Sequence, residues 1–152
     1  MRDRFATHDV TNQVPSLTDV NLLASDAALT DAVSREGAAT SLRTLNAFAL
    51  TAGSEDVREL ARQANAHPPR LQTHDRNGRR SDQVAYHPAY HELMRLSCAE
   101  GLNNSVWAHL GLAGGGPDKA APHVVRAANL YLAAQMEAGH CCPLTMTNAA
   151  VP

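Results

Sequence analysis

Apolar residues recur at helical spacing over most of the chain, but the first two dozen positions are polar and irregular. Pro15 interrupts any regular pattern there, so we expect residues 1–24 to form an extended N-terminal arm. Helical periodicity begins at Ser25, a predicted N-cap, with Asp26 placed to favour the positive helix end. Gly37 is a predicted C′ residue, so the first helix should end just before it.

Two further helices are predicted before residue 68. One spans about Thr40 to Ala52, since apolar residues follow a 3.6-residue period and Gly53 comes directly after them. The next is capped by Ser54 and should end at His67, because a residue that precedes proline avoids helical geometry.

Residues 68–87 break this pattern. Asn77-Gly78 is a turn signal, since these two residue types tolerate a positive φ, but apolar residues on either side are too sparse for confident strands. We therefore expect either a long ordered loop or a short hairpin.

The C-terminal half returns to helical patterns. We expect helices from Pro88 to Gly101, around Val106, Trp107 and Leu110, from about Pro122 to Gly139, and from Pro143 onward, with Gly114-Gly115-Gly116 as a connector. The last of these helices reads as unfinished at the end of the chain. The fold class predicted for residues 25–152 is therefore all-α, a bundle of five to seven helices.

The composition favours a helical fold and argues against some classes of function. Apolar residues make up 44% of the chain and aromatic residues only 4%, a mixture that favours close-packed helices over strands. The formal net charge of −2 gives no overall basic field to attract nucleic acid or an acidic membrane surface. No apolar run approaches the roughly 20 residues of a membrane helix, and no signal peptide is evident, which indicates a cytoplasmic protein.

Histidines and cysteines offer only weak candidate sites. His87 and His91 are spaced to place two imidazoles on one metal, but further ligands are not evident, and a capping or packing role is the preferred interpretation. Cys98, Cys141 and Cys142 do not form a disulfide framework. The last two could form a strained vicinal disulfide, although free thiols are the simpler expectation.

The charged and glycine-rich segments offer no candidate catalytic site. Arg76, Arg79 and Arg80 could touch phosphate, but acidic neighbours favour a solvated turn. The glycine run has no lysine where a phosphate-binding loop needs one. The helical glutamates, expected on solvated faces or in salt bridges, are Glu36, Glu92, Glu100 and Glu137. We therefore assign no catalytic residue and no metal ligand.

Several segments, in order along nearly the whole chain, carry a resemblance to a known family. They include Asn21-Leu22-Leu23-Ala24-Ser25-Asp26, Asp75-Arg76-Asn77-Gly78-Arg79-Arg80-Ser81-Asp82-Gln83-Val84, Gln135-Met136-Glu137-Ala138-Gly139 and Cys142-Pro143-Leu144-Thr145-Met146-Thr147. Together they resemble AidB-like adaptive-response flavoproteins of the acyl-CoA dehydrogenase superfamily.

The resemblance implies the N-terminal helical domain of that fold, so residues 25–152 would be a helical domain that stops at its junction with a β domain. The longer family member would use FAD to dehydrogenate an acyl-CoA thioester between its α and β carbons. It would also assemble as a homo-oligomer, a tetramer, and bind double-stranded DNA in the alkylation response. The catalytic base and most flavin contacts would lie in other domains, so this segment alone should be inactive.

The junction residues Thr145, Met146 and Thr147 are the candidate cofactor-binding residues, as one wall of the flavin and acyl cavity. Two hydroxyls around a thioether suit a mixed polar and apolar pocket, although an ordinary helix start with capping threonines would look similar. The alternative function is a stand-alone helical interaction module without catalytic activity.

Overall fold

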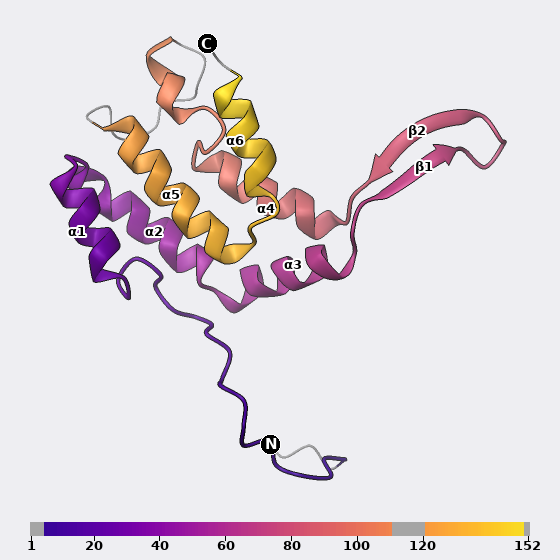
Figure 1. Ribbon diagram of the computed structural model, residues 1–152, viewed down its shortest axis with the longest axis horizontal. Coiled ribbons are helices and arrows are strands. Elements are labelled where there is room, and N and C mark those ends of the chain that lie inside the picture. Colours follow the sequence, from indigo (N-terminus) through magenta and orange to yellow (C-terminus); the bar gives the residue numbers. More distant parts are fainter. Residues whose placement is uncertain (1–4, 111–120, 151–152) are drawn as a thin grey trace.

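A computed structural model describes residues 5–110 and 121–150 (Figure 1). In that part of the chain there are six α-helices, two short 3-10 helices and two strands. The α-helices are α1 (Ala27–Arg35), α2 (Leu42–Ala52), α3 (Glu55–Ala66), α4 (Pro88–Ala99), α5 (Pro122–Met136) and α6 (Cys141–Ala149). The 3-10 helices are η1 (Ala39–Ser41) and η2 (Ser105–Leu110), and the strands are β1 (Arg70–His74) and β2 (Arg80–Ala85). The predicted glycine connector at 114–116 lies outside the described residues.

The all-α prediction needs one correction, because the protein is mostly helical but contains a two-stranded sheet. β1 and β2 pair antiparallel, with Leu71 opposite Val84 and Gln72 opposite Gln83. The hairpin, one of the two alternatives expected for residues 68–87, projects from the helical body between α3 and α4 (Figure 1). Each strand has a single large apolar residue, Leu71 in β1 and Val84 in β2, so no alternating pattern was present to identify a strand.

Most predicted helix boundaries are confirmed by the caps. Ser54 accepts a hydrogen bond from the Val57 N–H at the start of α3, and Pro88 occupies the first turn of α4. Gly37 has a φ of 88°, as expected just beyond the end of α1. The predicted cap of α1 is wrong by one residue, because Asp26 rather than Ser25 accepts from the Leu29 N–H.

The predicted ends of the two C-terminal helices are also displaced. α5 ends at Met136, three positions before Gly139, and α6 begins at Cys141, two positions before Pro143. The predicted helix around Val106 and Trp107 is the 3-10 helix η2. Proline is tolerated within the first turn of a helix, where no intrahelical donor is required, so Pro143 does not mark the first residue.

The core lies where α2, α4, α5 and α6 meet. Its fully buried large side chains are contributed by different elements and include Leu45, Leu93, Leu102, Leu132 and Leu144. Ala49 on α2 and Ala133 on α5 are completely buried, and these two helices pack against each other. Small side chains allow close approach of helices, which explains why an alanine-rich, aromatic-poor sequence forms this bundle.

The N-terminal arm reaches the body at Val20. The Val20 N–H donates to the Gly53 carbonyl oxygen at 3.3 Å, and Leu22 and Leu23 are buried. Gly53 is required here, because a Cβ at that position would lie 1.9 Å from the Val20 carbonyl oxygen. Residues before this anchor extend away from the helices (Figure 1).

No helix within the described residues is both long and apolar enough to cross a membrane.

Candidate functional site

The predicted wall residues lie together on the outer face of α6. Leu144 points into the core with 1% of its surface exposed, whereas Met146 is 64% exposed and Thr145 and Thr147 are exposed beside it. A helix turns by about 100° per residue, so three consecutive outward positions cover a broad face. That face offers one thioether and two hydroxyl groups.

The two hydroxyls differ in what they can still bind. Thr147 donates its hydroxyl proton to the Pro143 carbonyl oxygen at 2.8 Å, so only its lone pairs remain available as acceptors. The Thr145 hydroxyl makes no hydrogen bond to another described residue and can both donate and accept. Thr145 is therefore the more versatile contact for a polar ligand atom.

A buried hydrogen-bonded chain fixes the start of α6 against α4. The Ser97 Oγ lies 2.8 Å from the His140 Nε2, and the His140 Nδ1 lies 3.2 Å from the Glu137 Oε2. An ionised carboxylate can only accept, so the His140 Nδ1 carries a proton and donates it to Glu137, while the Nε2 pairs with the Ser97 hydroxyl. Ser97 of α4 and two groups of the α5–α6 turn, His140 and Glu137, are thus satisfied in a region where an unpaired polar atom would be costly.

Glu137 also closes the turn between α5 and α6. Its two carboxylate oxygens accept from the backbone N–H groups of Gly139 and His140, both at 2.7 Å. Burial alone would raise the pKa of the Glu137 carboxyl, but these backbone bonds and the His140 side chain lower that pKa below its ordinary value. The group is therefore ionised near neutral pH.

The far end of α6 is tied to η2. The Trp107 indole Nε1 donates to the Asn148 carbonyl oxygen at 2.9 Å, across 41 residues of sequence. Together with the His140 chain, this bond fixes both ends of the helix that carries Thr145, Met146 and Thr147. The orientation of the outer face is thus set by one buried and one partly buried hydrogen bond.

Serine, histidine and glutamate in this order resemble a nucleophile with its base and orienting acid. Ser97 and His140 are both 0% exposed, however, so no substrate atom can reach the hydroxyl. The arrangement can orient α6 but cannot perform acyl transfer. Sequence analysis did not identify it, since Ser97 is 43 residues from His140 and only the Glu137–His140 spacing is local.

The cysteines near this region are free thiols, which agrees with the simpler expectation. Burial, and then the nearby Glu137 carboxylate, raises the pKa of the Cys141 thiol, and burial raises the pKa of the Cys98 thiol. Both groups remain protonated near neutral pH. They are therefore poor nucleophiles.

The histidine pair has the capping and packing roles preferred from the sequence. The His87 Nδ1 accepts from the Ala89 N–H at 3.2 Å, and the His87 ring stacks on His67 with centroids 4.5 Å apart. His91 instead makes edge contacts with Tyr86 and Tyr90. Within residues 5–110 and 121–150, no group of three or more metal-ligating side chains converges.

Of the four glutamates expected on helices, only Glu92 lies within one, because Glu36, Glu100 and Glu137 each follow the last residue of a helix. Three of the four have partners. Glu36 pairs with Arg35 and Glu92 with Arg95, both exposed ion pairs of the expected kind. Glu137 has the buried partners described above. Burial raises the pKa of the Glu100 carboxyl.

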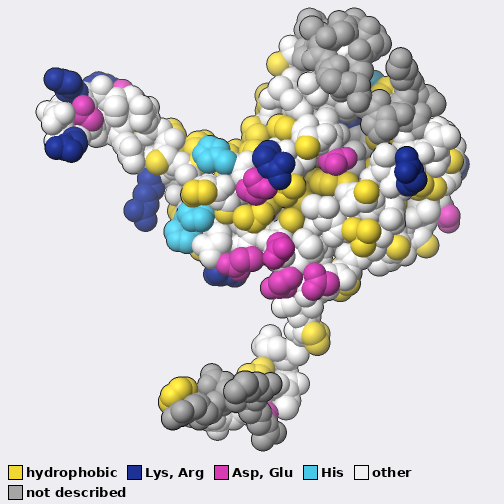
Figure 2. All heavy atoms as spheres, turned by 180° about the vertical axis from the view of Figure 1, so that it is seen from behind, with side chains coloured by type: hydrophobic (Ala, Val, Ile, Leu, Met, Phe, Trp, Pro, Cys, Tyr) yellow, Lys and Arg dark blue, Asp and Glu magenta, His cyan; other side chains and the backbone are white. Residues whose placement is uncertain are grey.

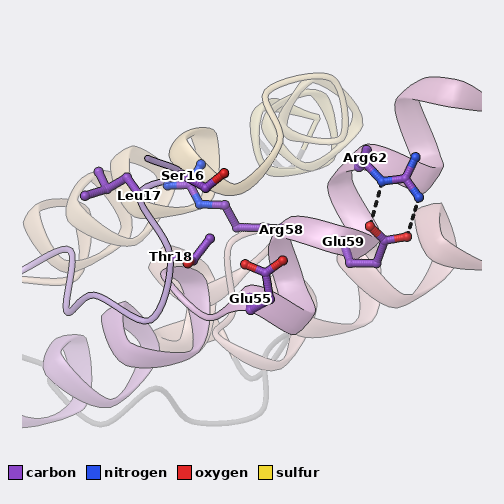
Figure 3. Close-up of a pocket in the computed structure, with 7 residues that line it drawn as sticks. All are labelled: Ser16, Leu17, Thr18, Glu55, Arg58, Glu59 and Arg62. Carbon is purple, nitrogen blue, oxygen red and sulfur yellow. Dashed lines mark hydrogen bonds and ion pairs between the residues drawn. The ribbon is translucent and has the colours of Figure 1, made fainter. Parts of the chain in front are cut away.

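A separate pocket of about 250 Å³ lies between the arm and α3 (Figure 3). Glu59 and Arg62 form a bidentate ion pair at its edge, with both N–O distances at 2.6 Å. Arg58 extends across the pocket toward Ser16, and its buried Nε has no partner among the described residues. The lining residues are Ser16, Leu17, Thr18, Glu55, Arg58, Glu59 and Arg62.

Comparison with known proteins gives matches over most of the chain. A family profile described as the adaptive response protein AidB N-terminal domain matches residues 12–152. The putative acyl-CoA dehydrogenase AidB of Escherichia coli (strain K12) is 42% identical over 148 residues, which are 97% of this chain and 26% of that protein. This chain therefore spans about a quarter of that relative.

Two solved structures have a similar fold. The apo form of Bd2924 superposes with a TM-score of 0.72 at 23% identity, over 90% of this chain and 26% of that one. Caenorhabditis elegans ACDH-11, in complex with C11-CoA, superposes with a TM-score of 0.69 at 24% identity, over 96% of this chain and 24% of that one.

Proposed function

Since the chain belongs to the AidB N-terminal domain family and is homologous to the putative acyl-CoA dehydrogenase AidB, we propose that it forms one wall of an FAD-dependent active site. The wall is the outer face of α6, with Thr145, Met146 and Thr147. The observation that carries this proposal is that hydrogen bonds fix both ends of α6, one of them fully buried, while its outer face has exposed apolar and hydroxyl groups.

The residues on this face fit one side of a flavin and an acyl chain. Met146 offers a polarisable thioether for contact with a ring or a hydrocarbon chain. The Thr145 hydroxyl is free to hydrogen-bond a ring heteroatom or a thioester oxygen. Bound FAD would supply the hydride acceptor for α,β-dehydrogenation of the acyl-CoA.

In this proposal the chain's own residues bind and orient, and exclude water from one side of the cavity. The Ser97–His140–Glu137 chain holds α6 in place, so that the three outer side chains keep their positions. The proton-abstracting carboxylate belongs to another part of the longer protein. This chain alone is expected to bind no flavin and to be inactive.

The family assignment favours this function over a stand-alone interaction module. We further propose a cytoplasmic location, a tetrameric full-length protein, and double-stranded DNA as its partner, all from the family resemblance. The helical domain of residues 25–152 would then be the first domain of that protein, followed by a β domain.

A chimeric protein tests the proposed wall. Residues 1–152 would replace the matching N-terminal quarter of the Escherichia coli relative, and flavin content would be measured from visible absorbance after purification. We expect Thr145→Val and Met146→Ala to lower flavin occupancy or shift the flavin spectrum, whereas the control Thr51→Val, at an exposed position on α2, should change neither. Unchanged flavin content and spectrum in both wall variants would contradict the proposal.

A further inference from the structure

Three glutamates in this chain are followed, three residues later on the same helix, by an arginine. Side chains at this spacing are neighbours on the helix surface and can pair directly. Two of the three pairs form bidentate ion pairs: Glu59 with Arg62 and Glu92 with Arg95. Glu55 and Arg58 form no ion pair with each other or with another described residue, so both charges remain open to a different partner.

The Arg58 side chain extends instead across the pocket between the arm and α3, toward Ser16 (Figure 3). Its Nε is buried and has no hydrogen-bond partner among the described residues. A buried N–H donor without an acceptor is costly, because it has lost its bonds to water. The orientation of this side chain therefore indicates an acceptor group that binds in the pocket.

The arm side of the pocket is anchored and offers hydroxyl groups. The Asp19 carboxylate accepts from the Glu55 backbone N–H at 3.0 Å, and the φ of 54° at Asp19 turns the arm onto α3. Ser16 and Thr18 line the pocket beside this anchor, and neither hydroxyl makes a hydrogen bond to another described residue. Two free hydroxyls therefore line the same pocket as the unpaired Arg58 guanidinium.

The charges in the lining define the kind of ligand. Glu59 and Arg62 neutralise each other, which leaves Arg58 as an unpaired cation and Glu55 as an unpaired anion. A simple anion would pair with Arg58 but would be repelled by the acidic side chains that gather where the arm leaves the body (Figure 2). A simple cation would leave the Arg58 Nε without an acceptor. A molecule with both a carboxylate and an ammonium group satisfies both residues.

We propose that this pocket binds a small α-amino acid as its zwitterion. The carboxylate accepts from the Arg58 guanidinium and the hydroxyls of the arm, and the ammonium group donates to the Glu55 carboxylate. The pocket volume of about 250 Å³ is below the roughly 300–1,000 Å³ of pockets for drug-sized ligands, so it suits a molecule of this size. Leu17, the apolar residue of the lining, is 62% exposed and can contact a short apolar ligand side chain.

This site uses no residue of α6 and does not depend on the proposed flavin cavity. Because the ligand contacts both the arm and α3, its binding also ties the arm to the helix. Ligand that binds only the folded protein stabilises it, so thermal stability should rise with the concentration of the amino acid.

Titration of the chain with L-alanine at neutral pH tests the proposal. The Arg58 Nε–H group gives its own signal in a proton–nitrogen NMR spectrum, and alanine should shift this signal until the site is saturated. Propionate and ethylamine are matched probes, since each equals alanine without one of its two charged groups. We expect each of them to bind at least about tenfold more weakly than alanine, because one charged hydrogen bond is lost.

Variants at the two unpaired charges provide a second test, with the Thr18 backbone N–H signal as the measure of binding. Arg58→Met keeps the apolar stem and Glu55→Gln keeps the shape, and each should weaken alanine binding at least about tenfold. Arg58→Lys should also weaken it, since an ammonium group cannot present the planar fork. Arg43→Met, at an exposed position on α2, is the control and should bind like the wild type. Circular dichroism melting checks that every variant is folded.

Three results would overturn the proposal. If Arg58 pairs with Glu55 in solution, Glu55→Gln will move the Arg58 signal while alanine will not. If propionate binds as tightly as alanine and Glu55→Gln leaves its affinity unchanged, the pocket is a simple anion site. If none of the three probes gives a saturable shift, the pocket takes no ligand of this class.

Discussion

The Ser97 hydroxyl and the His140 ring are joined by a hydrogen bond of 2.8 Å with no exposed surface on either residue. This bond joins α4 to the start of α6. It makes the position of the proposed wall depend on two side chains that no ligand can touch.

Ser97→Ala should therefore destabilise the protein by about 1–3 kcal/mol, the usual cost of leaving a buried polar atom unpaired. His140 Nε2 would lose its partner, with no water-accessible alternative. Chemical denaturation followed by circular dichroism measures the change. Ser34→Ala, at an exposed position on α1, is the control and should stay within about 0.5 kcal/mol of wild type.

Replacement of Glu137 by glutamine should remove part of the pH dependence of stability. The pKa of this carboxyl is lowered in the folded state, so its stabilising contribution is complete above the unfolded pKa of about 4.3 and is lost as the pH falls through the folded value. We expect Glu137→Gln to cost about 1.5–3 kcal/mol at pH 7 and less at acidic pH. An equal loss at pH 7 and at acidic pH, in denaturation curves at both, would be inconsistent with an ionised Glu137.

The ion pair of Glu59 with Arg62 predicts a change in the pKa of one carboxyl group, that of Glu59. Hydrogen bonds from Arg62, and then from Gln63, lower the pKa of Glu59 to about 2. Carbon-detected NMR titration should find this low value, and Arg62→Met should raise the pKa toward the ordinary glutamate value. Arg95→Met is a control at the equivalent pair and should leave the pKa of Glu59 unchanged.

Gly53→Ala should be more disruptive than Gly37→Ala. The added Cβ would lie 1.9 Å from the Val20 carbonyl oxygen, so the arm must move away from α2. Gly37→Ala meets no atom within 4 Å and should cost only about 1–2 kcal/mol for its positive φ. A smaller loss of thermal stability for Gly53→Ala than for Gly37→Ala would show that the arm is not anchored there.

The sequence was sufficient where local chemistry determines the structure. Ser54, Gly37 and Pro88 mark helix ends because a cap or a fixed dihedral angle is a property of a few adjacent residues. The sequence was insufficient where the structure depends on contacts between residues that are distant along the chain. The strands have only the Leu71 and Val84 pair to indicate them, and the pairing itself becomes visible only in three dimensions.

The candidate site likewise combines residues that the sequence predicted with residues that only the structure identified. Thr145, Met146 and Thr147 were selected from the sequence, and the structure places all three on the outer face of α6. The residues that hold this helix were not found, since Ser97 and Trp107 lie in segments distant from it in the sequence. A single serine or tryptophan gives no sequence signal of its partner.

The central claim is that the outer face of α6 lies against the cofactor and substrate. A crystal structure of the flavin-loaded chimeric protein with an acyl-CoA bound measures this directly. We predict that atoms of Thr145, Met146 or Thr147 lie within about 4 Å of the flavin or the acyl chain. A structure in which other residues surround both ligands and this face packs elsewhere would contradict the account.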